Sequence, residues 1–157
     1  MIILSRPPRI KVLEALGCIA DGRIKVINEN YVKVTSSLGD KTYNVYVDLN
    51  RGVAYSDDNG TKYRNYIGYP IIALLMIKGV LPYDKRISEA LKGIPWKILN
   101  EKYKKYALVE REVLKIARSK GISSSELMSF VKKVMNKISE LKLEKLNSLP
   151  LEVYKSP

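Results

Sequence analysis

The chain has 157 residues, of which 46% are hydrophobic and 28% charged, so it has the size and composition of one globular domain and wholesale disorder is excluded. Its 28 Lys and Arg outnumber its 16 Asp and Glu, and the formal net charge of +12 predicts a polyanionic partner. The chain has no His and a single Cys, Cys18, which excludes histidine catalysis, histidine metal sites and an internal disulfide.

The first predicted element is a helix that opens with residues 5–9, carries the prolines at positions 7 and 8 in its first turn, buries one apolar face and ends at Gly22. From Arg23 the apolar period changes from about 3.6 to 2 residues, which predicts an antiparallel meander of three to five strands over residues 23–66. The turns of this meander include a hairpin turn at Asn59 and Gly60.

The solvated face of the meander is a first candidate binding surface. Alternation along the strands predicts that it carries Lys25, Tyr31, Lys33 and Tyr46. Tyrosine rings can stack on bases while lysines contact phosphates. The chain has 11 Tyr and lacks Gln, a composition typical of thermophiles that predicts an archaeal source, and this composition alone also accounts for the tyrosines.

Helices are predicted for the rest of the chain. The apolar run from Ile71 to Ile77 predicts a buried helix over residues 71–78, because a membrane span needs about 20 apolar residues. A short helix capped by Asp84 and a long helix from Pro95 through Ala117 are expected to follow. The last helix is expected to begin with a capping box at Ser123 and to end at residues 149–150, before a tail over 150–157.

These elements predict an α+β fold, in which an N-terminal helix and a small antiparallel meander pack on a buried helix and two long C-terminal helices follow. We expect one domain over residues 1–157, with a sheet-containing half (1–80) and a helical half (81–149). The first 80 residues hold 11 basic and 7 acidic side chains, and the remaining 77 hold 17 and 9, so the helical half is the more basic.

Residues 113–133 resemble the helix-turn-helix of DNA-binding proteins, with Ala117 where two helices touch, Gly121 in the turn and Ile122 directly after it. The resemblance implies that the helix from Ser124 enters a major groove. Ser124 and Ser125 would then lie near bases, and the side chains expected near phosphates are Arg118, Lys120, Lys132, Lys133 and Lys137. The same residues also fit an αα-hairpin in which Gly121 ends one helix and Ser123 caps the next.

Residues 53–75 resemble a SWIM domain, a small zinc-binding module of nucleic-acid and protein recognition. Its four ligand positions would fall on Val53, Tyr55, Gly68 and Pro70, which do not bind zinc, so the resemblance implies a degenerate, zinc-free relative. A chance ββα arrangement explains the same segment. The Asp57–Gly60 stretch lacks the alternate carboxylates of a calcium loop, and no catalytic cluster stands out.

The sequence therefore predicts a nucleic-acid-binding protein without enzymatic activity, metal or cofactor, which prefers DNA to RNA and acts mainly by phosphate neutralisation. The alternative is an interaction subunit that docks its helical hairpin into a larger nucleic-acid machine. Such a subunit is expected to leave the apolar seam of the last helix, Leu127 to Leu141, partly exposed. The start Met1–Leu4 is too short for a signal-peptide core, so the expected location is the cytoplasm, with no membrane partner.

Overall fold

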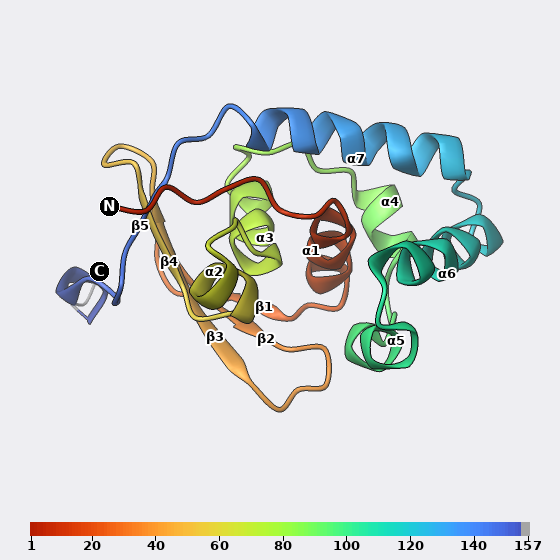
Figure 1. Ribbon diagram of the computed structural model, residues 1–157, viewed down its shortest axis with the longest axis horizontal. Coiled ribbons are helices and arrows are strands. Elements are labelled where there is room, and N and C mark those ends of the chain that lie inside the picture. The colour runs from red at the N-terminus through yellow and green to blue at the C-terminus, as the bar shows by residue number, and fades with distance from the viewer. Residues whose placement is uncertain (155–157) are drawn as a thin grey trace.

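The computed structural model describes residues 1–154 and confirms the α+β class (Figure 1). One face of a sheet packs against helices, and the buried core extends through both halves of the chain. The helices among the described residues are α1 (Ile10–Ala20), α2 (Asn59–Arg64), α3 (Tyr69–Ile77), α4 (Lys85–Ala90), α5 (Trp96–Tyr103), α6 (Tyr106–Ser119), α7 (Ser124–Ile138) and the 3-10 turn η1 (Leu151–Tyr154).

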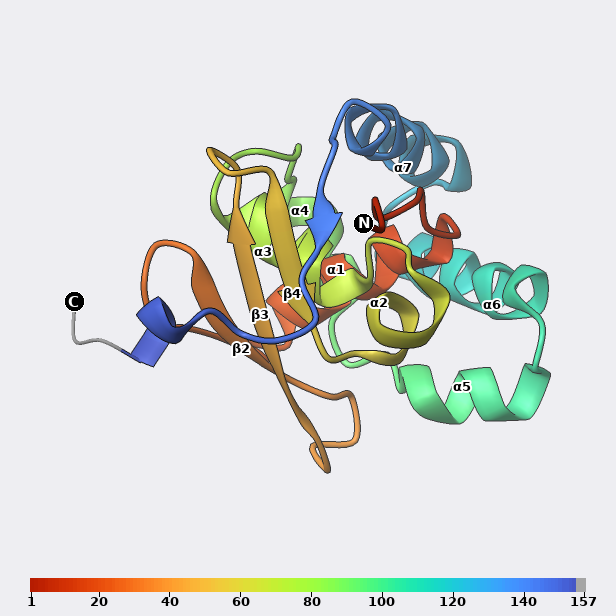
Figure 2. The same ribbon diagram turned by 60° about the vertical axis from the view of Figure 1, so that its left-hand side comes forward.

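The sheet has the strand order β1-β2-β3-β4-β5. The strands are β1 (Ile24–Val26), β2 (Tyr31–Thr35), β3 (Thr42–Asp48), β4 (Val53–Ser56) and β5 (Glu144–Lys145). Strands β1 to β4 form the expected antiparallel meander, which ends ten residues earlier than predicted. Strand β5 runs parallel to β4, as Figure 2 shows, so the C-terminal part of the chain completes the sheet.

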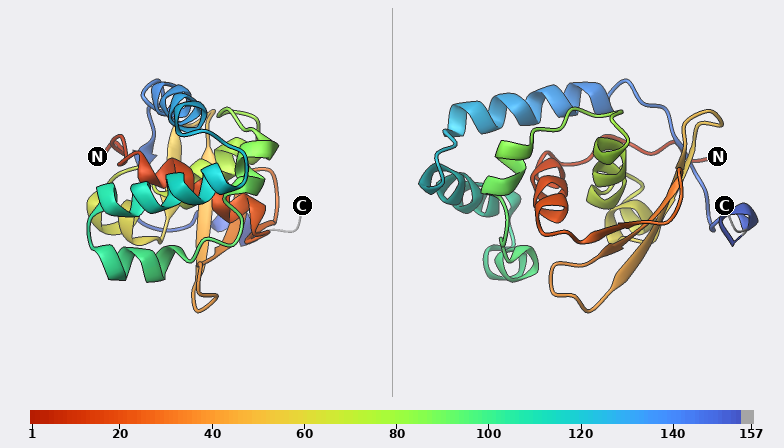
Figure 3. Two further views of the ribbon diagram at one scale, coloured as in Figure 1. Left: turned by 90° about the vertical axis from the view of Figure 1, so that its right-hand side faces the viewer. Right: turned by 180° about the vertical axis from the view of Figure 1, so that it is seen from behind.

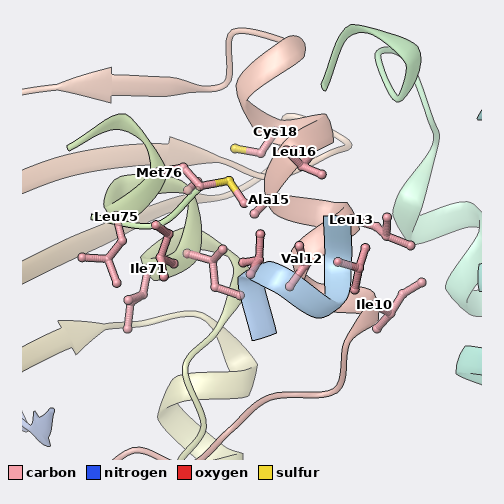
Figure 4. Packing of buried hydrophobic residues seen from close by; sticks show 14 of the residues in the cluster. Ile10, Val12, Leu13, Ala15, Leu16, Cys18, Ile71, Leu75 and Met76 are labelled. Atoms are coloured by element: carbon pink, nitrogen blue, oxygen red, sulfur yellow. The ribbon is translucent and has the colours of Figure 1, made fainter. Parts of the chain in front are cut away.

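Helix α1 lies at the centre of the molecule (Figure 1), where it contacts α3, α4 and α7. The prediction of a single apolar face was wrong, because eight of its 11 residues are buried. The side chains of its apolar residues interlock with Ile71, Leu75 and Met76 of α3 (Figure 4). A helix surrounded on all sides is apolar on all sides, and Lys11 and Glu14 are the only charged residues of α1.

Three predicted helix starts are confirmed. Pro70 lies in the first turn of α3, the Asp84 carboxylate accepts a hydrogen bond from Ile87 N at 3.1 Å, and Ser123 Oγ accepts one from Glu126 N at 3.1 Å. Asp84 and Ser123 each accept a hydrogen bond from a backbone amide that the first turn leaves unpaired, and Pro70 has no amide N–H that would need a partner there. Within residues 1–154, no helix combines the length and the apolar character that a membrane crossing requires.

The predicted long helix from Pro95 to Ala117 is broken into α5 and α6. Lys104 adopts a left-handed backbone conformation with φ of 58° and caps α5 through a hydrogen bond from its N–H to Asn100 O. A continuous helix over the 24 residues from Trp96 to Ser119 would be about 36 Å long. The break lets both helices bury apolar residues, Leu99 from α5 and Val109 from α6, and places them side by side (Figure 3).

The last helix also ends earlier than predicted, at Ile138 instead of residues 149–150. Beyond it, Leu141 and Leu143 alternate with charged residues, a period that fits a strand better than a helix, and β5 follows. The predicted tail forms η1 over Leu151–Tyr154, while residues 155–157 lie outside the described part of the chain.

The hairpin turn predicted at Asn59 and Gly60 is instead the first turn of α2. Asp58 caps this helix, because its Oδ2 accepts a hydrogen bond from Thr61 N at 3.2 Å. Residues 53–75 thus fold as β4, α2 and α3, so a helix lies where a ββα arrangement requires a second strand.

Candidate functional site

The α7 lysines, Lys132, Lys133 and Lys137, lie on the outer side of α7, opposite its buried residues. All three are exposed. Within residues 1–154, Lys132 and Lys133 make no ion pair, and Lys137 contacts Glu140 at 3.6 Å with both side chains more than half exposed. Exposed pairs of this kind neutralise little charge. The α7 lysines therefore leave positive charge available on the surface.

Helix α6 has a basic stripe of its own, which sequence reasoning recognised only in part. Arg111, Lys115 and Arg118 are exposed and spaced four and three residues apart, on the side opposite the buried Val113 and Ala117. The signal was present in the sequence, because a 3.6-residue period places these three side chains on one face.

The connection between α6 and α7 contains the predicted helix-turn-helix positions. Gly121 has φ of 90°, Ile122 is buried and Ser123 caps α7, as both the helix-turn-helix and the hairpin interpretations require. Two of the residues expected to reach nucleic acid have partners inside the protein. Arg118 Nη1 donates to Ser124 Oγ at 3.2 Å, and Lys120 Nζ donates to Lys92 O at 3.2 Å.

Ser125 is exposed at the start of α7, whereas Glu126 next to it forms an ion pair with Arg86 of α4. An acidic side chain at this end of α7 would repel phosphate groups. Further along α7, the exposed Lys132 and Lys133 have no ion-pair partner among the described residues.

The expected face of the meander forms, but its tyrosines are not available to bases. The register pairs Lys25 with Lys33 and Tyr31 with Tyr46, so all four side chains share one face as predicted. The prediction that Tyr31 and Tyr46 are exposed was wrong, because they are 6% and 2% exposed and belong to one buried cluster with Val153 of η1. Burial, followed by a hydrogen bond to Glu152, raises the pKa of Tyr46 to about 12. The C-terminal segment crosses this face in Figure 2, and of the four predicted side chains only Lys25 and Lys33 are exposed.

A polar cleft of about 350 Å³ lies between α1, the β2–β3 hairpin and α5. Its volume falls within the range of small-molecule sites, about 300 to 1,000 Å³. Cations and carboxylates line the cleft in equal number, together with Trp96, Tyr43 and Tyr69. The sequence predicted no such site.

A buried ion pair forms one wall of the cleft. Lys11 Nζ contacts Glu14 Oε2 at 3.1 Å, and the two side chains are 15% and 5% exposed. Burial by itself lowers the pKa of Lys11, but the Glu14 carboxylate, together with Tyr106 and Asp58, outweighs burial and holds this pKa above its ordinary value. Lys11 is therefore positively charged near neutral pH.

Helix α5 adds two polar atoms that are enclosed and have no hydrogen-bond partner among the described residues, Trp96 Nε1 and Asn100 Oδ1. Asn100 Nδ2 donates to Glu14 Oε1 at 3.4 Å, which orients the carboxamide. Helix α1 approaches α5 closely at Gly17, where a Cβ atom would lie 2.8 Å from Trp96 Nε1. Leaving buried polar atoms unpaired costs about 1 to 3 kcal/mol each, so such atoms call for an explanation.

Arg23 lines the cleft from the sheet side. Its Nε contacts Asp21 at 3.3 Å, and its Nη1 donates to Thr35 O at 2.8 Å. The guanidinium carbon lies 5.9 Å from the centre of the Tyr69 ring. Burial raises the pKa of Tyr69, which remains a neutral phenol.

One sequence signal could have indicated the cleft. Lys11 and Glu14 are three residues apart and are the only charged residues in the otherwise apolar run Ile10–Ala20. A helix that is apolar all round is buried, so a charged pair within it must be buried too. Asn100 and Arg23 gave no such signal, because only tertiary packing places them beside this pair.

These features define a small basic α+β protein with exposed lysines on α7 and a buried ion pair in a polar cleft. The family described as Uncharacterised conserved protein UCP014422 matches residues 4–144, and the chain belongs to that family. The matched range includes α1 to α7, and with them the cleft and the α7 lysines. Comparison with curated proteins and with solved structures gives no match.

Proposed function

We propose that this protein binds nucleic acid without enzymatic activity, that it prefers DNA to RNA, and that it acts mainly by neutralising phosphates. The observation that carries the proposal is the exposure of Lys132 and Lys133 without acidic partners among the described residues, in a chain of net charge +12. Lysines placed in this way release counterions when they meet a phosphate backbone. The exposed basic stripe of α6 adds to this positive charge.

The apolar seam of α7 supports a free-standing binder over a docking subunit. Its residues Leu127, Val131, Val134 and Ile138 are each no more than 2% exposed, and Leu141, which lies beyond the end of α7, is partly buried against the same core. A subunit that docks through this seam would need it accessible. The single free cysteine, Cys18, is compatible with a reducing compartment, so we propose a cytoplasmic location.

Base readout has a limited role in this proposal. Ser124 already accepts a hydrogen bond from Arg118, and Glu126 would repel phosphates close to Ser125. The binding energy is therefore assigned to phosphate contacts, which position a protein on nucleic acid without reading its sequence.

The test compares two charge reversals of equal size. Lys132→Glu with Lys133→Glu changes α7, and Lys25→Glu with Lys33→Glu changes the exposed part of the sheet. Fluorescence anisotropy with duplex DNA, single-stranded DNA and structured RNA over a salt series gives the log-log slope for each variant. We expect the α7 variant to lose about 0.9 of slope per phosphate contact removed and to weaken binding to all sequences alike.

The sheet variant controls for the change in net charge. Equal losses in both variants would mean that net charge alone attracts nucleic acid and that α7 is not the contact surface. A parent protein that binds none of the three nucleic acids at low salt would contradict the proposal itself.

A further inference from the structure

Three tyrosines form a row across neighbouring strands of the sheet. In the register, Tyr46 of β3 lies between Tyr31 of β2 and Tyr55 of β4, so their side chains share one face and are direct neighbours. The main core lies on the other face, and this tyrosine row belongs to a second, smaller cluster. Lys25 and Lys33 are exposed on the same face as the row. Aromatic rings and cations together on one sheet face form a platform on which single-stranded nucleic acid can bind.

The C-terminal segment over residues 146–154 covers the tyrosine row, and Figure 2 shows it crossing the sheet on the side away from the helices. Val153 of η1 is 7% exposed and packs in the same small cluster as the three rings. Within residues 1–154, the last backbone hydrogen bond from this cover to the sheet runs from Leu146 N to Ala54 O at 2.8 Å. Among the described residues, side chains therefore hold η1 against the row.

Glu152 places a carboxylate of the cover against the row. The Tyr46 hydroxyl donates a hydrogen bond to Glu152, and Arg51 Nη1 lies 3.5 Å from the same carboxylate oxygen. A phenol and a guanidinium are also donors that phosphate oxygens accept from. The cover therefore places an anion and apolar side chains on the sheet, where a bound nucleotide would place its phosphate and its base.

The cover adds nothing to the main core, because none of its described residues belongs to that core. Leu151 is 83% exposed. Both side chains of the Arg51–Glu152 pair are more than half exposed, and exposed pairs of this kind hold a segment weakly. The cover also lies beyond the residues that match the family. Its departure would uncover the row and leave the core packed.

We propose that the tyrosine row is a binding site for single-stranded nucleic acid, and that the cover competes with the nucleic acid for it. When the cover leaves, bases stack on the rings while Lys25 and Lys33 contact phosphates. The carboxylates of Asp48 and Asp57 lie on the same face, so stacking supplies more of the binding than charge does. This site is separate from α7, and the proposal does not rest on the α7 lysines.

The main test releases the cover in the full chain. Val153→Asp places a carboxylate among the rings, and Leu151→Asp is the matched control, since it makes the same change of charge two residues away at an exposed side chain. Fluorescence anisotropy measures binding of oligothymidine, oligouridine and duplex DNA. We expect Val153→Asp to bind the single strands at least about tenfold more tightly than the control does, with no gain for the duplex, whose paired bases do not stack on the rings.

The two single strands tell whether DNA or RNA is the better ligand. Both variants are less basic than the parent, so a gain does not come from net charge. Because stacking dominates, the gained affinity should depend less on salt than the binding of duplex DNA by α7 does.

Release of the cover is measured separately. Burial and the hydrogen bond to Glu152 raise the pKa of Tyr46 to about 12, so in Val153→Asp this pKa should fall toward its ordinary value of about 10. An NMR titration of the tyrosine rings follows it. In the Val153→Asp background, Tyr46→Ala should remove most of the gained affinity because it deletes the central ring. Lys25→Glu with Lys33→Glu should weaken single-strand binding more in this background than in the intact chain.

A second variant keeps the test valid if Val153→Asp does not fold. Glu152→Gln loosens the cover without a charge among the rings, and should give a smaller gain in the same direction. Glu89→Gln, at another exposed carboxylate, controls for its change in charge.

Each outcome decides the proposal. A gain for single strands that Tyr46→Ala removes supports it. Release of the cover without a gain overturns it, because the row then serves another partner or none. A Tyr46 pKa that stays high in a folded Val153→Asp variant also overturns it, because the segment is then a fixed part of the fold. The charge reversals on α7 leave the sheet intact, so the gain should persist with them, and failure here is distinguishable from failure of the proposed binding by α7.

Discussion

Helix α1 is buried on two sides that differ in chemistry. Toward α3 it presents apolar side chains that fill the core (Figure 4), whereas toward the cleft it presents the Lys11–Glu14 pair. Both sides exclude water to a similar degree, since Leu13 is fully buried and the Glu14 side chain is 5% exposed. Burial alone therefore does not separate a structural surface from a functional one. The chemistry of the buried groups distinguishes the two surfaces, because only the apolar side gains stability from losing water.

The largest effect is expected on the apolar side. Leu13→Ala removes a side chain with no exposed surface and should lower the free energy of unfolding by about 2 to 5 kcal/mol, because the removed methyl groups leave a cavity. Chemical denaturation measures the change. As a matched control, Ile98→Ala removes a side chain that is 53% exposed and should have a much smaller effect. Equal effects of the two variants would contradict this assignment of the core.

On the cleft side, replacing one member of the ion pair should destabilise the protein more than replacing both members. Lys11→Met leaves the Glu14 carboxylate buried without its cation and should destabilise the protein by about 3 kcal/mol. The double variant Lys11→Met with Glu14→Leu should recover most of that loss. If the double variant is less stable than the single one, the pair stabilises the fold and the two sides of α1 do not differ as described.

A smaller effect is expected at Gly17, where α1 meets Trp96 of the cleft. In Gly17→Ala the new Cβ would lie 2.8 Å from Trp96 Nε1 and 3.2 Å from Leu91 O. Overpacking costs about 1 to 3 kcal/mol, and the better helix propensity of Ala offsets up to about 1 kcal/mol of it. Thermal unfolding measures the net loss. In a Trp96→Leu background most of this loss should disappear, and an unchanged loss would mean that the indole is not the obstacle.

Local patterns in the sequence predicted much of this fold. The caps at Asp84 and Ser123 and the proline in the first turn of α3 each act within a few residues, so they determine helix starts whatever the surroundings. The prolines at positions 7 and 8 were expected inside the first turn of the first helix, but α1 begins after them, at Ile10. Period-2 alternation likewise gave the meander and the shared face of Lys25 and Lys33. The exposure of the α7 lysines follows from the same kind of signal, because a 3.6-residue period separates them from the buried seam.

Only the tertiary structure decided the rest. The break at Lys104 and the end of α7 at Ile138 depend on where the core ends, and a periodic pattern does not contain that information. The burial of Tyr46 depends on Val153, which is more than a hundred residues away along the chain. The cleft combines Glu14 with Asn100, 86 positions further on, and no local pattern brings them together. Propensity, capping and periodicity are short-range effects, whereas a binding site is made by contacts between distant segments that only the packed core brings side by side.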